Sequence, residues 1–91
     1  MDIEAQYRVA LDLTHQMLGA ATGQEWERLT LIEKQRSLIV ERIARTKLTV
    51  PPANATRIAE IIAEMESENA EIMERVKCWQ EHVKILLRMK D

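Results

Sequence analysis

The chain has 91 residues, with 13 Lys and Arg against 15 Asp and Glu and a formal net charge of −2. Two glycines and two prolines are too few for the many tight turns of an all-β fold. A hydrophobic fraction of 46% excludes a disordered chain, and the absence of a basic excess argues against a nucleic-acid partner. We therefore expect a single all-α domain covering residues 1–91.

The cysteine count and the N-terminus bear on the compartment. Cys78 is the only cysteine, so an internal disulfide is impossible and a reducing environment fits. The first residues lack the basic segment of a signal peptide, and no apolar run reaches the length of a membrane span. These features predict a cytoplasmic protein without a membrane span.

Helical periodicity divides the chain into three helices near 2–22, 24–46 and 55–89. Gly23 is expected to end the first helix, and the pair Pro51-Pro52 separates the second from the third. Short connections favour antiparallel neighbours, so we predict an antiparallel three-helix bundle: a helical hairpin plus a long third helix that outruns it. The third helix carries a heptad seam: Ile58, Ile62, Met65, Asn69, Ile72, Val76, Trp79, Val83 and Leu86.

Each predicted helix has a polar residue in its apolar stripe at about the same height. These residues are Thr14, Glu33 with Arg36 one turn on, and Asn69. We expect them to form one structural polar layer, in which Glu33 hydrogen-bonds Asn69 and Arg36 neutralises Glu33. Such a layer fixes the register of a bundle more often than it binds a ligand.

No pattern for catalysis, for a cofactor or for a metal stands out. His15 and His82 are far apart, and Glu-x-x-His units, phosphate loops and nucleophile elbows are missing. His15 with Gly19 faintly matches a histidine-phosphotransfer motif, but Leu18 stands where that motif has a Lys. Helix 2 faintly resembles the first helix of helical chorismate mutases, without the cationic spacing that such a site needs. We predict a non-enzyme.

Apolar residues also occur on helix faces that a bundle of three helices would leave exposed to solvent. Grouped at helical spacing, such residues predict a surface for a partner helix or for self-association. The predicted partner-binding residues are Leu31, Leu38, Cys78, Ile85, Leu87 and Met89.

Two segments resemble the FliT family of flagellar type III export chaperones. The first is Ala-Ala-Thr-Gly-Gln-Glu-Trp-Glu-Arg-Leu, which places Trp26, Leu29 and Glu33 at the family spacing. The second is Ile-x-x-Ile followed by seven residues and Asn, seen as Ile58, Ile61 and Asn69, ahead of a long amphipathic helix.

The resemblance implies a cytoplasmic helical chaperone that binds a helical segment of the filament-capping protein before export. It also implies contacts with the export ATPase machinery and, in some bacteria, with the flagellar master regulator. The family's fourth helix, which covers the client groove, is expected to be absent. Alternatives from other classes are a coiled-coil module that forms a homodimer through the third helix, and a phosphotransfer domain that uses His15.

Overall fold

The computed structural model describes residues 3–45 and 52–88, and these residues form three helices. The helices are α1 (Ile3–Thr22), α2 (Trp26–Arg45) and α3 (Pro52–Arg88). No strand occurs in the described ranges, so the predicted all-α class is confirmed. Helix α3 begins three residues earlier than predicted, at Pro52, because a helix tolerates proline in its first turn, where the missing N–H would have no partner anyway.

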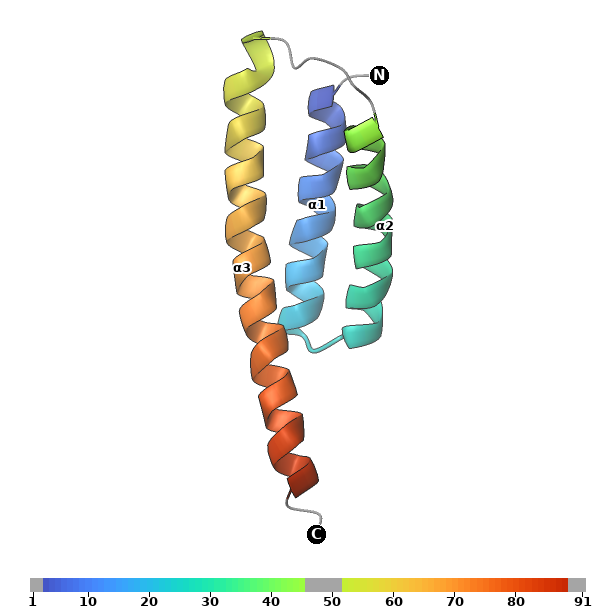
Figure 1. The fold of residues 1–91 in the computed structure, drawn as a ribbon, viewed down its shortest axis with the longest axis vertical. Helices are drawn as coiled ribbons and strands as arrows, with labels where there is room; N and C mark the ends of the chain where they lie inside the picture. Colours follow the sequence, from blue (N-terminus) through green and yellow to red (C-terminus); the bar gives the residue numbers. More distant parts are fainter. Residues whose placement is uncertain (1–2, 46–51, 89–91) are drawn as a thin grey trace.

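Helix α1 is the centre of the bundle. Figure 1 shows α1 between α2 and α3, antiparallel to α2 and parallel to α3. The backbone of α1 packs closely against both neighbours, whereas no Cα of α2 lies within 8 Å of a Cα of α3 in the described ranges. Successive helices are antiparallel, as predicted, but only the first pair packs backbone against backbone, and α2 and α3 meet through side chains.

The sequence of α1 explains its central position. Its buried residues recur every three or four positions, and most are small, which lets two helices approach its backbone. They are Ile3, Gln6, Ala10, Thr14, Met17, Ala20 and Ala21. Helix α2 adds Leu29 and Ile32 to the core, and α3 adds Ile58, Ile61 and Ile72.

The turn between α1 and α2 uses an unexpected residue. Gln24, with a φ of 57°, is the non-glycine residue in the left-handed region, and neither glycine of the described chain has a positive φ. The N–H groups of Gly23 and Glu25 donate to the last carbonyls of α1, those of Gly19 and Ala20, at 3.0 and 2.8 Å. The helix end predicted at Gly23 is thus present, but Gln24 adopts the strained conformation.

Helix α3 extends well past its neighbours. It has 37 residues against 20 in each of the other helices, and its C-terminal part projects beyond the α1–α2 turn (Figure 1). The molecule is accordingly elongated, at 59 × 20 × 19 Å. Leu86, predicted to lie in the buried seam, is exposed because neither α1 nor α2 reaches that level. Within the described ranges, none of the three helices is both long and apolar enough to cross a bilayer.

Candidate functional site

The wide spacing of α2 and α3 leaves a hollow between them, which we call the α2–α3 groove. Its volume is about 450 Å³. The groove is lined by Met17, Trp26, Leu29, Thr30, Glu33, Arg36, Asn69, Ile72, Met73, Val76, Trp79 and Gln80. Residues from all three helices take part, so the groove exists only in the folded bundle.

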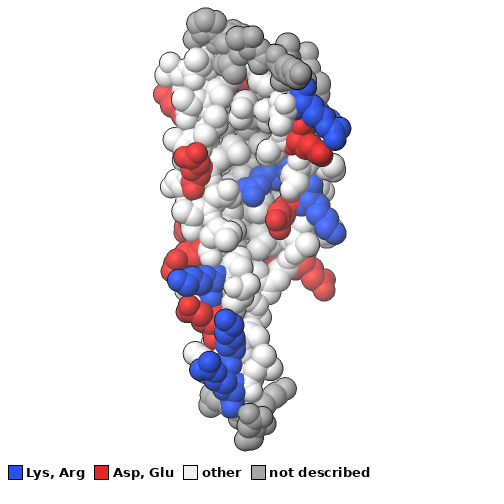
Figure 2. Space-filling view, in the orientation of Figure 1, with Lys and Arg blue, Asp and Glu red and all other residues white. Residues whose placement is uncertain are grey.

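The groove combines buried apolar residues with exposed ones at its edge. Leu29 and Ile72 are buried, whereas the side chain of Met73 is 66% exposed. In Figure 2, which shows the molecule in the orientation of Figure 1, uncharged surface runs along the middle, and charged side chains gather on the α2 side and on the lower part of α3. An exposed methionine is suited to an adaptable apolar contact, because its side chain is unbranched and flexible.

A polar network crosses the bundle at the groove. Arg36 on α2 donates from Nη1 to the hydroxyl of Thr14 on α1 at 3.2 Å and to the side-chain carbonyl of Asn69 on α3 at 2.6 Å. Thr14 is fully buried and donates its own proton to the carbonyl of Ala10 at 2.8 Å. Three helices are thus joined through one guanidinium.

Glu33 does not take the place that the sequence suggests. Among the described residues it makes no hydrogen bond to Asn69, and its side chain is exposed. The predicted Glu33–Asn69 bond is therefore wrong. The physical reason is that the long side chain of Arg36 spans the gap between α2 and α3. Its guanidinium carries several N–H donors, which bind the two neutral acceptors Thr14 and Asn69.

Two tryptophans close one end of the α2–α3 groove. The rings of Trp26 on α2 and Trp79 on α3 stack with centroids 5.5 Å apart and an interplanar angle of 29°. Both rings also border a second hollow of about 580 Å³ beneath the end of α1, together with Cys78 and His82. The aromatic pair therefore separates two neighbouring concave surfaces.

None of the predicted partner-binding residues that the structure describes lines the α2–α3 groove. Leu31, Leu38, Ile85 and Leu87 are exposed, and none of them lines the groove. Leu38 borders a hollow whose lining residues all come from α2, and Cys78 borders the second hollow. Met89 lies outside the described residues.

The groove residues that the sequence did not single out for binding include Met73, Trp26 and Trp79. Trp79 falls on the predicted heptad seam, so the periodic pattern assigns it to the core, and Trp26 is named only for its place in the family spacing. Met73 directly follows the buried Ile72, so the order of apolar residues alone does not show that Met73 is exposed. The available signal is the pair of large rings at matching heights on α2 and α3, since rings of that size can bridge helices that are too far apart to pack.

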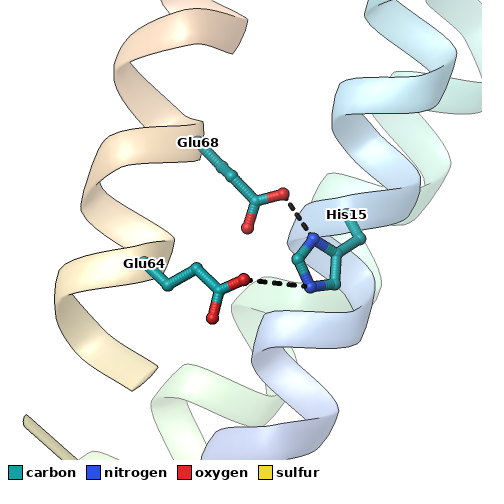
Figure 3. Close-up of side chains that lie close together, drawn as sticks. All are labelled: His15, Glu64 and Glu68. Atoms are coloured by element: carbon teal, nitrogen blue, oxygen red, sulfur yellow. Dashed lines mark hydrogen bonds and ion pairs between the residues drawn. The ribbon is translucent and has the colours of Figure 1, made fainter. Parts of the chain in front are cut away.

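His15 lies on α1 against α3, between two carboxylates (Figure 3). Its Nδ1 pairs with Glu68, and its Nε2 lies 3.8 Å from an oxygen of Glu64. A phosphoryl group on this imidazole would meet two negative charges, which repel it. The geometry therefore argues against the phosphotransfer alternative.

Comparison with known proteins places the chain in a family. The family model for flagellar protein FliT matches residues 4–89, which is nearly the whole chain. No curated protein and no solved structure gives a significant match. The matched range includes all of the groove residues on the three helices. The chain belongs to the FliT family, a family of flagellar export chaperones and not of enzymes.

Proposed function

We propose that this chaperone holds an amphipathic helical segment of the filament-capping protein in the α2–α3 groove and keeps it competent for export in the cytoplasm. The observation that carries the proposal is the gap between α2 and α3. Three packed helices normally cover one another, but here α2 and α3 flank a hollow of mixed apolar and polar lining, and no pair of Cα atoms across it lies within 8 Å among the described residues. A fourth helix laid along the groove would complete the packing.

The dimensions of the groove fit a short helix. Its α3 wall runs from Asn69 to Gln80, which corresponds to about 17 Å or three helical turns at 1.5 Å per residue. A client helix of three turns presents apolar anchors at positions i, i+3, i+4 and i+7. Leu29, Ile72 and Met73 provide the apolar surface for such anchors.

Charged groups at the groove would orient the client. Glu33 is exposed and lines the wall, and Arg36, one helical turn further along α2, lines it as well. A charged residue on the client flank beside Glu33 would set the register of the bound helix more than its affinity.

The exposed residues predicted from the sequence remain proposed partner contacts, and we refer to them together as the second surface although they lie on two separate parts of the molecule. Leu31 and Leu38 on α2, with Ile85 and Leu87 on α3, are separate from the α2–α3 groove. They are candidates for contacts with the export ATPase machinery, with the master regulator or with a second copy of the chain. Light scattering of the isolated protein tests the last of these.

Matched charge substitutions show which of the two surfaces binds the client. The test titrates a labelled peptide from the C-terminal helical segment of the capping protein into the full chain and follows fluorescence anisotropy. Met73→Asp is expected to weaken binding by about tenfold or more, because it places a charge against the client's apolar face. Leu38→Asp is the control, since Leu38 is 63% exposed and lies outside the groove.

Far-UV circular dichroism establishes that each variant keeps its helicity. If Leu38→Asp combined with Ile85→Asp abolishes binding while Met73→Asp leaves it intact, the client uses the second surface and the groove assignment is wrong. If none of the variants affects binding, both surfaces are excluded for this client.

A further inference from the structure

We propose that His15, Glu64 and Glu68 form a binding site for a divalent transition metal of the zinc class, and that the bound ion links α1 to α3. One ligand comes from α1 and two come from successive turns of α3 (Figure 3). None of the three residues lines the α2–α3 groove, so this site is separate from the proposed client site.

The positions of the ligand atoms carry the proposal. A ring nitrogen of His15 and one carboxylate oxygen from each glutamate all lie within 4.8 Å of one another. In a tetrahedral zinc site with bonds of about 2.0–2.2 Å, the ligand atoms are about 3.4 Å apart. The widest pair therefore needs to close by at most about 1.4 Å, which Glu64 can do by rotation because its side chain is 56% exposed. His15 Nδ1 and Glu68 are already in direct contact and need to move slightly apart to admit an ion.

Glu68 provides a second, independent observation. Its side chain is only 14% exposed, and one of its carboxylate oxygens is buried without a hydrogen-bond partner in the described part of the chain. A buried acceptor on a charged group is costly when it is unpaired. A cation held between the two glutamates would compensate both the buried oxygen and the repulsion between the carboxylates.

The donor set selects the kind of metal. Imidazole nitrogen suits Zn²⁺, Ni²⁺, Co²⁺ and Cu²⁺, whereas Mg²⁺ and Ca²⁺ prefer oxygen ligands alone and in larger number. Three protein ligands leave a fourth tetrahedral position for water, which is accessible here because the His15 side chain is 45% exposed. The ion would act by joining two helices in the folded state, so it stabilises the bundle by mass action.

The experiment uses the full chain carrying Cys78→Ala and His82→Asn, because these two residues lie one helical turn apart on α3 and could bind zinc themselves. ZnCl₂ is titrated by calorimetry, and thermal unfolding is followed by circular dichroism with ZnCl₂ or MgCl₂. We expect saturable Zn²⁺ binding, and a rise in Tm of about 10 °C or more at roughly a hundredfold excess over Kd, with no rise in MgCl₂.

Three substitutions and one control locate the ion. His15→Asn, Glu64→Gln and Glu68→Gln should each weaken Zn²⁺ binding by about tenfold or more, whereas Glu66→Gln, an exposed residue of the same helix, should have no effect. Metal-free circular dichroism shows whether each variant is folded. No saturable Zn²⁺ binding, or undiminished binding by His15→Asn and Glu64→Gln, would overturn the proposal. Client binding is measured separately, so failure here leaves the groove assignment untouched.

Discussion

The guanidinium of Arg36 on α2 donates to the side-chain carbonyl of Asn69 on α3 across 2.6 Å, and this bond joins two helices with no pair of Cα atoms within 8 Å of each other among the described residues. The same guanidinium reaches Thr14 on α1. A single charged group therefore supplies a contact between α2 and α3 that backbone packing does not provide.

Removing the acceptor alone is expected to destabilise the protein. Asn69→Leu leaves the partly buried Arg36 with one acceptor fewer, at an expected cost of about 1–2 kcal/mol in the free energy of unfolding. Arg36→Met combined with Asn69→Leu replaces both partners by apolar groups and should recover most of that loss. Urea unfolding of the two single variants and the double variant measures the difference. Additive losses in the double variant would contradict a direct coupling.

The left-handed conformation of Gln24 leads to a second prediction. A non-glycine residue in this region costs about 1–2 kcal/mol, and glycine avoids that cost while losing some entropy. Gln24→Gly is therefore expected to stabilise the protein by about 0.5–1 kcal/mol, measured by thermal or urea unfolding. Gly23→Ala is the matched control: Gly23 has no positive φ, and an added Cβ would meet its nearest atom, the Gly19 carbonyl oxygen, at 3.5 Å. Gly23→Ala should therefore not lower the free energy of unfolding.

Gly19 offers a stabilising substitution inside a helix. It lies in α1, and an added Cβ would meet nothing within 4 Å. Glycine in a helix interior is about 1 kcal/mol less favourable than alanine, so Gly19→Ala should raise the free energy of unfolding by up to that amount. A loss of stability on urea unfolding would show that the space beside Gly19 is occupied in solution, for example by a second chain.

The stacked tryptophans are expected to be energetically coupled. A double-mutant cycle with Trp26→Leu and Trp79→Leu should give a coupling energy of about 0.5–1.5 kcal/mol, since aromatic pairs are worth that much beyond their buried area. The control cycle combines Trp26→Leu with Ile58→Val, because Ile58 lies about 30 Å along α3 from Trp79. Equal coupling in the two cycles would mean that the stack contributes nothing specific.

The sequence predicts the three helices well because each has a strong apolar period. The existence of three helices, the heptad pattern of α3 and its excess length can all be read from the order of the residues alone. The spacing between α2 and α3 is not predictable in this way. It depends on how closely two helices approach α1, and a periodic pattern shows which face is buried but not the distance across it.

The candidate site is harder to predict for the same reason. Leu31 and Leu38 stand out in the sequence because they lie off the apolar stripe of α2, which is a property of one helix. Met73 and the tryptophan pair matter because of where α2 stands relative to α3. The pairing of His15 with Glu64 and Glu68 likewise depends on the parallel alignment of α1 and α3, and a local pattern on either helix does not contain it.

The central position of α1 has a mechanical consequence. The backbones of α2 and α3 each pack closely against α1, whereas the contacts between α2 and α3 are made by side chains, among them the Arg36–Asn69 hydrogen bond and the Trp26–Trp79 stack. A change in the separation of α2 and α3 would therefore be resisted by side-chain packing and not by closely packed backbones. We accordingly expect this separation to adjust to the diameter of the helix that the groove holds.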